Sequence, residues 1–159
     1  MAGAPTPAIA ALTRAKMPHT LHPYHHDPDS TAFGDEVVQA LGWPAERVFK
    51  TLVATVDGKL TVGIVPVSSQ LDLKALAAAV GGKKAAMAKV ADAERSSGYV
   101  AGGISPLGQR RPLPTVVDRT AADFATIMVS AGKRGLQVEL APTDLITATR
   151  AILASIASR

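Results

Sequence analysis

Lys50 lies inside a run of β-forming residues, 48–56, and its position limits what this chain can fold into. Side chains alternate between the two faces of a strand, so Lys50 shares its face with apolar residues. These are Val48, Leu52, Ala54 and Val56. Burying an ammonium group is costly unless a partner offsets the charge. The position therefore predicts either a pocket for a carbonyl, carboxylate or phosphate, or a lysine whose stem packs while its head reaches water.

Length and composition favour one domain that covers residues 1–159. A chain of 159 residues with 47% hydrophobic residues can bury one sizeable core and is short for two domains. The absence of cysteine excludes disulfides, thiolate zinc sites and a cysteine nucleophile. A net charge of +4 suits a polyanionic partner such as RNA, although many basic soluble proteins have none.

The N-terminal stretch has the pattern of neither a secretory signal nor a membrane span. Its apolar residues are interrupted by Pro5, Pro7, Thr13, Arg14 and Lys16. We therefore expect a cytoplasmic protein without membrane contact. No long apolar helix stripe remains after the core helices are counted, so we also expect a monomer.

Capping and stop signals predict several short helices. Thr6 followed by Pro7 is typical of a helix start, and Gly42 is typical of a helix end. Asp72 has the residue type of an N-cap. We expect helices over residues 7–17, 35–41, 73–80 and from 143 or 144 to 156, and a further short helical piece over 85–88.

The most definite pair of strands surrounds Asp57-Gly58. The β-rich runs 48–56 and 60–67 flank this dipeptide, a pattern typical of an antiparallel hairpin with a tight primed turn. Further strands are expected at 115–117 and 125–129, and an extended segment at 20–25. Because strands and short helices interleave, we expect a mixed α/β fold with a curved, mainly antiparallel sheet rather than a doubly wound parallel one.

Four histidines near the N-terminus, His19, His22, His25 and His26, raise the hypothesis of a metal site. The prolines at 18, 23 and 28 prevent the helix that would bring two of them to one face, and no second ligand cluster follows. We therefore expect no metal and no cofactor. The alternative is a polar, partly exposed segment in which Tyr24 packs against the core.

The glycine-rich segment 102–108 cannot form a regular element. It is not a nucleophile elbow, because Leu107 stands where that motif needs glycine, so Ser105 is a weak nucleophile candidate. Its glycines would let backbone amides approach a ligand closely, as in an oxyanion hole. A tight structural turn is the equally simple alternative.

Three basic doublets lie at Lys83-Lys84, Arg110-Arg111 and Lys133-Arg134. The first does not form a phosphate-binding P-loop, since the spaced glycine and the following Ser or Thr are missing. Only if the doublets gather around one opening would they form a track for phosphates.

The chain resembles the YbaK-type aminoacyl-tRNA deacylases, stand-alone relatives of the editing domain inserted in bacterial prolyl-tRNA synthetases. The resemblance extends over nearly the whole chain and is closest to the branch that clears cysteine from proline tRNA. The matching segments are residues 24–28, 33–38, 48–52, 70–74, 95–99, 102–109, 124–127 and 129–135.

The resemblance implies a mixed α/β domain around a curved, mainly antiparallel sheet, with a pocket for the aminoacylated 3′ end of a tRNA. It makes Lys50 the catalytic lysine and suggests prolyl-tRNA synthetase as a partner. The residues that it places around the aminoacyl group are Tyr24, Phe33, Thr51, Gly102 and Ser130. We expect Gly103 and Ser105, in the matching glycine-rich segment, to bind the substrate as well. Gln137 departs from the family pattern, which has an acidic residue there, and is not included among these sites.

The implied activity is removal of cysteine from Cys-tRNA(Pro), and also from Cys-tRNA(Cys), by attack of the substrate thiol on its own ester. Enforced proximity favours such an attack, and amides with an ammonium group can stabilise the oxyanion without a protein nucleophile. Two alternatives stay open. One is a deacylase of the same fold that removes alanine or another small amino acid with water, and the other is a tRNA-end binding module without turnover.

Overall fold

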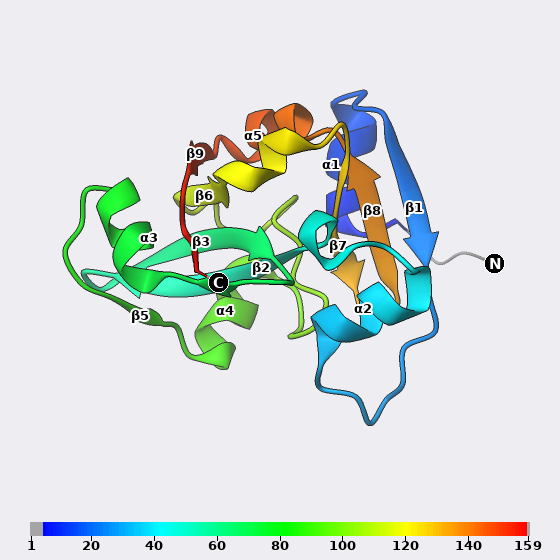
Figure 1. Ribbon diagram of the computed structural model, residues 1–159, viewed down its shortest axis with the longest axis horizontal. Coiled ribbons are helices and arrows are strands. Elements are labelled where there is room, and N and C mark those ends of the chain that lie inside the picture. Colours follow the sequence, from blue (N-terminus) through cyan, green and yellow to red (C-terminus); the bar gives the residue numbers. More distant parts are fainter. Residues whose placement is uncertain (1–4, 159) are drawn as a thin grey trace.

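The computed structural model describes residues 5–158 of the 159 (Figure 1). Its helices are α1 (Pro7–Arg14), α2 (Phe33–Leu41), α3 (Leu73–Ala79), α4 (Val90–Ser97) and α5 (Pro142–Thr149), with the 3-10 helices η1 (Ala45–Arg47) and η2 (Arg119–Asp123). Its strands are β1 (His19–Pro23), β2 (Phe49–Val56), β3 (Lys59–Pro66), β4 (Gln70–Leu71), β5 (Ala85–Met87), β6 (Thr115–Asp118), β7 (Ile127–Lys133), β8 (Leu136–Leu140), β9 (Ile152–Ala154) and β10 (Ala157–Ser158).

The described strands form a five-stranded sheet in the order β5-β2-β3-β6-β9, a three-stranded antiparallel sheet in the order β1-β8-β7, and the pair β10-β4. In the larger sheet β5, β2 and β3 are antiparallel, whereas β6 and β9 join in parallel. A parallel bridge between Val48 and Met128 links the two sheets. The predicted mixed α/β fold, rich in antiparallel pairs and short helices, is confirmed.

The predicted hairpin is confirmed. β2 and β3 pair antiparallel, and Val56 faces Lys59 next to the turn. Asp57 and Gly58 have φ values of 51° and 81°, the left-handed conformations that a two-residue primed turn needs. This turn fixes the register of β2, and with it the face to which each side chain points.

Both faces of β2 are covered by apolar clusters. Phe49 and Val53 belong to the larger core, which also contains buried residues of α1, β7 and β8. Ala54 and Val56 pack in a second cluster with Leu76 of α3. The two apolar clusters thus lie on opposite faces of this strand.

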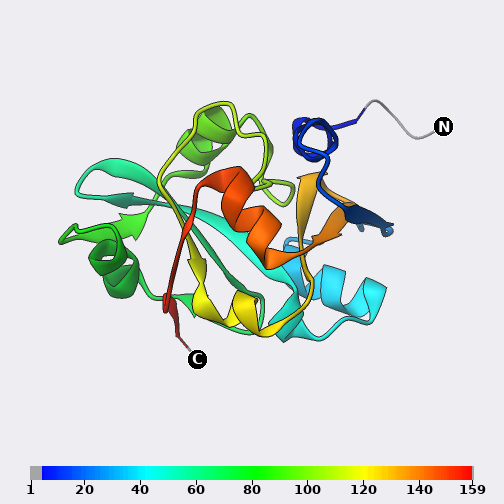
Figure 2. The ribbon, with the colours of Figure 1, turned by 90° about the horizontal axis from the view of Figure 1, so that it is seen from above.

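A third cluster fixes the position of α2. Val37 packs there against Val48 and Met128. In Figure 2 α1 and α2 lie on opposite sides of the strands β7 and β8. α2 therefore stands beside the end of β2 at which Lys50 lies.

The helix starts predicted at Thr6 and Asp72 are confirmed, whereas α2 and α5 begin at Phe33 and Pro142, one or two residues before the predicted starts. The Thr6 hydroxyl accepts a hydrogen bond from the amide of Ile9 at 3.2 Å, and the Asp72 carboxylate accepts one from Ala75 at 3.1 Å. Gly42 ends α2 with a φ of 67°.

Two helix predictions are wrong. Residues 85–87 form β5, because Ala85, Ala86 and Met87 complete the edge of β2 near the turn. The last helix ends at Thr149, because Arg150 after it adopts a left-handed conformation, and residues 152–154 pair with β6 instead. In both places pairing with an open sheet edge overrides the local helical pattern.

Candidate functional site

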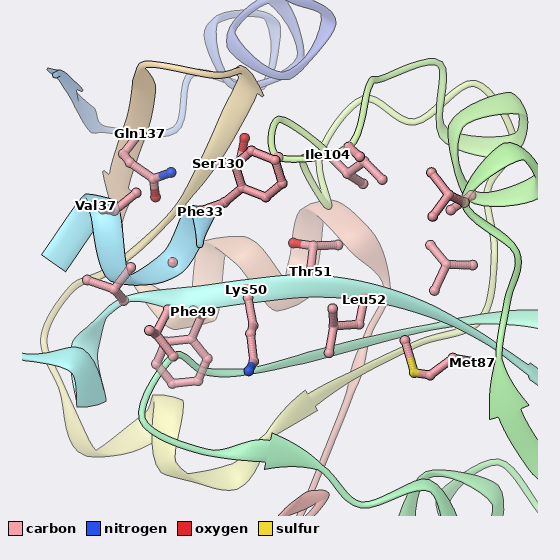
Figure 3. A pocket seen from close by; sticks show the side chains of 18 of the residues that line it. Phe33, Val37, Phe49, Lys50, Thr51, Leu52, Met87, Ile104, Ser130 and Gln137 are labelled. Atoms are coloured by element: carbon pink, nitrogen blue, oxygen red, sulfur yellow. The ribbon is translucent and has the colours of Figure 1, made fainter. Parts of the chain in front are cut away.

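A cavity of about 320 Å³ opens beside the edge of β2 (Figure 3). Five consecutive residues of this strand, 49–53, line it. Successive side chains point to opposite faces, so a cavity that touches all five lies beyond the edge of the strand. β5 pairs with β2 only from Ala54 to Val56, which leaves that edge uncovered by any described strand.

Lys50 lines this cavity and is half-buried. It extends from β2 on the opposite side to Thr51 (Figure 3). Burial lowers the pKa of its ammonium group, and the carboxylate of Asp35 partly opposes the shift. It thus lines a cavity, as the first of the two interpretations of the sequence predicted, and its role there stays a prediction.

Two unpartnered polar atoms face the same space. The hydroxyl of Thr51 and Oε1 of Gln137 are both buried, and neither has a hydrogen-bond partner in the described part of the chain. Gln137 is 5% exposed, and its side chain extends toward the cavity from β8 (Figure 3). Buried polar atoms without partners are rare and costly, so both atoms are candidates for hydrogen bonds to a ligand.

Ser130 adds a third polar side chain to the wall. It stands opposite Gln137 in the β7-β8 pair. Its oxygen accepts a hydrogen bond from the amide of Gly132 at 3.3 Å, which leaves its hydroxyl hydrogen free to donate to a ligand.

Phe33 forms the wall on the side of α2. Its ring lies 5.0 Å from the guanidinium carbon of Arg134, and its centroid lies 6.1 Å from that of His26. Arg134 also donates from Nε to the carbonyl of Ala101 at 2.7 Å. Gly102 has a φ of 85°, and a Cβ there would meet Phe33 at 2.6 Å, so glycine is required for this close packing.

The opposite rim is apolar and exposed. Met87 and Val90 line the cavity although they are 50% and 61% exposed. Ile104 and Ala93 add further apolar side chains to the lining. A mostly apolar lining with a few polar side chains suits a ligand with a flat apolar part and a polar end.

Three of the predicted substrate-binding residues do not line the cavity. Tyr24 packs against the third cluster, which agrees with the alternative prediction that the histidine segment is polar and that Tyr24 packs against the core. Gly103 is buried, and a Cβ there would lie 2.8 Å from Cα of Lys133. Ser105 is fully buried, and its hydroxyl accepts the amide hydrogen of Leu107 at 3.2 Å.

The loop 102–108 thus contributes to the cavity wall mainly through Gly102 and Ile104. The buried hydroxyl of Tyr99 donates to the carbonyl of Leu107 at 2.7 Å and holds the loop in place. Burial raises the pKa of Tyr99 to about 12, so this donor keeps its proton under ordinary conditions.

Two of the four histidines, His22 and His26, pair with different carboxylates. His22 pairs with Glu139 at 2.8 Å, and His26 pairs with Glu36 at 2.6 Å. Across residues 5–158 no three His, Cys, Asp or Glu side chains gather in a metal-binding arrangement. No helix in the same range is long and apolar enough to cross a membrane.

The basic doublets do not all gather at the opening. Arg134 stands beside the wall residue Phe33, whereas the amides of Lys83 and Lys84 bind the carboxylate of Asp57 at the hairpin turn. The amide of Arg110 bonds to the carbonyl of Ser97 at the end of α4. Of the three doublets, only Lys133-Arg134 therefore has a side chain, that of Arg134, against a residue of the cavity wall.

Sequence reasoning left Gln137 out of the site and did not identify the apolar rim. The alternation of Leu136, Gln137 and Val138 is typical of a strand with one polar face, and it could have marked Gln137 as a side chain directed away from the core. No local pattern distinguishes Met87 and Val90 from ordinary surface residues.

Comparisons with known proteins agree with this architecture. The aminoacyl-tRNA editing domain family matches residues 27–148. The Enterococcus faecalis protein named "Putative Cys-tRNA(Pro)/Cys-tRNA(Cys) deacylase EbsC" is 37% identical over 156 residues, which cover 97% of this chain and 94% of that protein.

Two solved structures share the fold. One, titled "Crystal structure of a putative trans-editing enzyme for prolyl tRNA synthetase", has a TM-score of 0.81 at 24% identity and covers 94% of each chain. The other, the hypothetical protein APE2540, has a TM-score of 0.85 at 20% identity over 96% of this chain and 100% of that one. With the family match and the relative of nearly equal length, these likenesses show that the chain belongs to the aminoacyl-tRNA editing domain family.

Proposed function

We propose that this protein is a trans-editing deacylase that removes cysteine from Cys-tRNA(Pro) and Cys-tRNA(Cys). The observation that carries the proposal is a cavity with a half-buried ammonium group, Lys50, and three polar side chains, but no cysteine nucleophile. Such a site can bind and polarise an ester while the attacking group comes from the substrate.

The reaction begins when the substrate thiol attacks the carbonyl carbon of its own ester. A sulfur–carbon bond forms, and the carbon–oxygen bond to the terminal ribose breaks. The thiol proton ends on the ribose oxygen, so the products are free tRNA and a cyclic thioester, which water then opens to cysteine. Holding the thiol near the carbonyl raises the rate, although ring strain opposes closure.

Lys50 is assigned to bind an oxygen of the substrate through its ammonium group. Burial lowers its pKa, which would favour a neutral lysine that acts as a general base. No other base or second lysine among the described residues lines the cavity to assist the loss of its proton, so we assign the charged form to Lys50. Its charge would stabilise the carbonyl oxygen as it becomes negative, or hold the terminal phosphate of the tRNA.

The test is the release of labelled amino acid from Cys-tRNA(Pro), Cys-tRNA(Cys), Ser-tRNA(Pro) and Ala-tRNA(Pro). Wild-type protein, Lys50→Ala and the control Lys83→Ala are compared, since Lys83 lies at the distant hairpin turn. Release of cysteine alone, lost only in Lys50→Ala, supports the proposal. Release of alanine selects a deacylase that uses water, and no release from any substrate leaves a binding module.

The proposal includes prolyl-tRNA synthetase as a partner that supplies the preference for proline tRNA, and a monomeric enzyme. Size-exclusion chromatography with light scattering, alone and with the synthetase and tRNA, measures the oligomeric state and the complex. A stable dimer would contradict the monomer. Deacylation rates measured without the synthetase test the partnership, since unchanged selectivity for Cys-tRNA(Pro) would remove the need for that partner.

A further inference from the structure

One edge of β2 pairs with a described strand over only part of its length, and the hairpin register shows which groups point to it. In a two-residue hairpin the residues next to the turn, Val56 and Lys59, exchange main-chain hydrogen bonds. Hydrogen-bonded pairs then recur at every second residue, so the even-numbered residues of β2 bond to β3. The amide and carbonyl groups of Phe49, Thr51 and Val53 consequently point away from β3.

Two hydrogen bonds and the position of one proline confirm independently which groups of β2 point away from β3. The carbonyl of Val53 accepts from the amide of Ala88, on the side of β5. The carbonyl of Val48 accepts from the amide of Val67, on the side of β3. Pro66, which has no amide hydrogen, lies opposite Phe49. This fits the register, because Phe49 accepts no hydrogen bond from β3.

Thr51 stands in the middle of this edge and beside the cavity. β5 pairs with β2 only from Ala54, and the link to β7 is a bridge at Val48, so no described strand pairs with the residues between. Unpaired strand edges offer an alternating row of donors and acceptors, and extended ligands commonly bind to such edges. The edge at Thr51 presents one amide donor and one carbonyl acceptor side by side.

An aminoacyl ester has the complementary pair of groups. Its carbonyl oxygen accepts, its α-ammonium donates, and both are attached to one Cα, as in a residue of a neighbouring strand. We propose that the amino acid of the substrate binds opposite Thr51 as an added strand residue: the Thr51 amide donates to the ester carbonyl, and the Thr51 carbonyl accepts from the α-ammonium. This inference rests on the proposed function and specifies how its site holds the substrate.

The pairing also fixes where the remaining groups lie. Directly opposite residues in an antiparallel pair have their side chains on the same face, so the substrate side chain would lie on the face of Thr51 and its unpartnered hydroxyl. Lys50 extends to the other side (Figure 3), where it would meet the ester or the nucleotide rather than the thiol. The Thr51 amide would bind more strongly as the carbonyl oxygen gains charge.

The experiment separates this binding mode from turnover. The probe is 3′-cysteinylamino-adenosine, in which a stable amide replaces the ester, and its affinity is measured by calorimetry. Thr51→Pro removes the amide hydrogen without breaking the β2-β3 ladder, because that hydrogen points away from β3. Thr51→Val keeps the amide and removes only the hydroxyl.

We expect Thr51→Pro to weaken binding about tenfold or more, and Thr51→Val to leave the main-chain contribution in place. On wild-type protein, the analogue that lacks the α-amino group should also bind about tenfold more weakly. This second measurement decides the matter if Thr51→Pro does not fold. Equal binding of the two analogues, or folded Thr51→Pro with wild-type affinity, would overturn the proposal. Probe binding without release of cysteine from Cys-tRNA(Pro) would overturn the proposed function and leave this inference standing.

Discussion

Gln137 and Ser130 stand directly opposite one another in the β7-β8 pair, and both side chains line the cavity beside β2. Oε1 of Gln137 is buried without a partner. The free protein therefore retains an unsatisfied acceptor at the point where a substrate donor would bind.

Replacing this side chain should separate stability from activity. Gln137→Leu has a similar volume and removes the unsatisfied polar group, so we expect the free energy of unfolding to stay the same or rise by about 1 kcal/mol. The KM for aminoacyl-tRNA should rise several-fold, because the acceptor is lost. Denaturant unfolding and steady-state deacylation measure the two effects, and a clearly destabilised variant with normal KM would contradict the assignment.

Gly102→Ala should disturb the wall formed by Phe33. The φ of 85° disfavours alanine, and its Cβ would lie 2.6 Å from the ring. We expect a loss of about 1–3 kcal/mol in stability together with a loss of deacylation. Gly42→Ala is the matched control, since Gly42 also has a positive φ but nothing lies within 4 Å of its Cβ position. It should lose stability and keep its activity.

The charge of Lys50 should limit activity at alkaline pH. Because burial lowers the pKa of Lys50 below 10.5, its ammonium form is lost at a lower pH than that of an ordinary lysine. The rate of deacylation, corrected for spontaneous ester loss, should fall as the pH rises through this lowered pKa. In Lys50→Arg the guanidinium stays charged, so whatever activity remains should show no such fall. The same alkaline fall in Lys50→Arg would exclude the lysine as its cause.

The same lowered pKa has a consequence for stability. The unfolded state binds the lysine proton more tightly than the folded state, so the charged lysine costs stability at neutral pH, and the cost disappears as the pH rises toward 10.5. Lys50→Met should therefore melt at an equal or higher temperature than wild type at pH 7 while losing activity. A lower melting temperature would show that the ammonium group stabilises the fold.

Acid stability should depend on Glu36. The hydrogen bond with His26, and then the one from the amide of Asp27, lower the pKa of Glu36 below 4.5. Stabilisation by this carboxylate is complete above 4.5 and is lost as the pH falls through the lowered pKa. Glu36→Gln should flatten the dependence of melting temperature on pH in this range, whereas Glu46→Gln at an exposed position should not.

The local parts of the fold were predictable because they depend on neighbouring residues. Asp57-Gly58 specifies the hairpin, and Thr6 and Asp72 specify helix starts, through contacts that span only a few positions. β5 and β9 were not predictable, because each is a strand only where a distant edge accepts it.

The site divides in the same way. The alternation along β2 identified Lys50 from its own segment. Gln137 depends on the pairing of β8 with both β1 and β7, and the open edge at Thr51 depends on where β5 stops. Neither relationship is written in a short stretch of sequence.

The position of β8 between β1 and β7 has a consequence for protein synthesis. β1 begins at His19, yet its partner strand lies more than a hundred positions later, at 136–140. A chain emerging from the ribosome can form the β2-β3 hairpin early, because its two strands are neighbours in the sequence. The cavity wall formed by Ser130 and Gln137 is missing until most of the sequence is translated. Truncated translation products therefore lack a complete binding cavity, and proofreading competence arises only near the end of elongation.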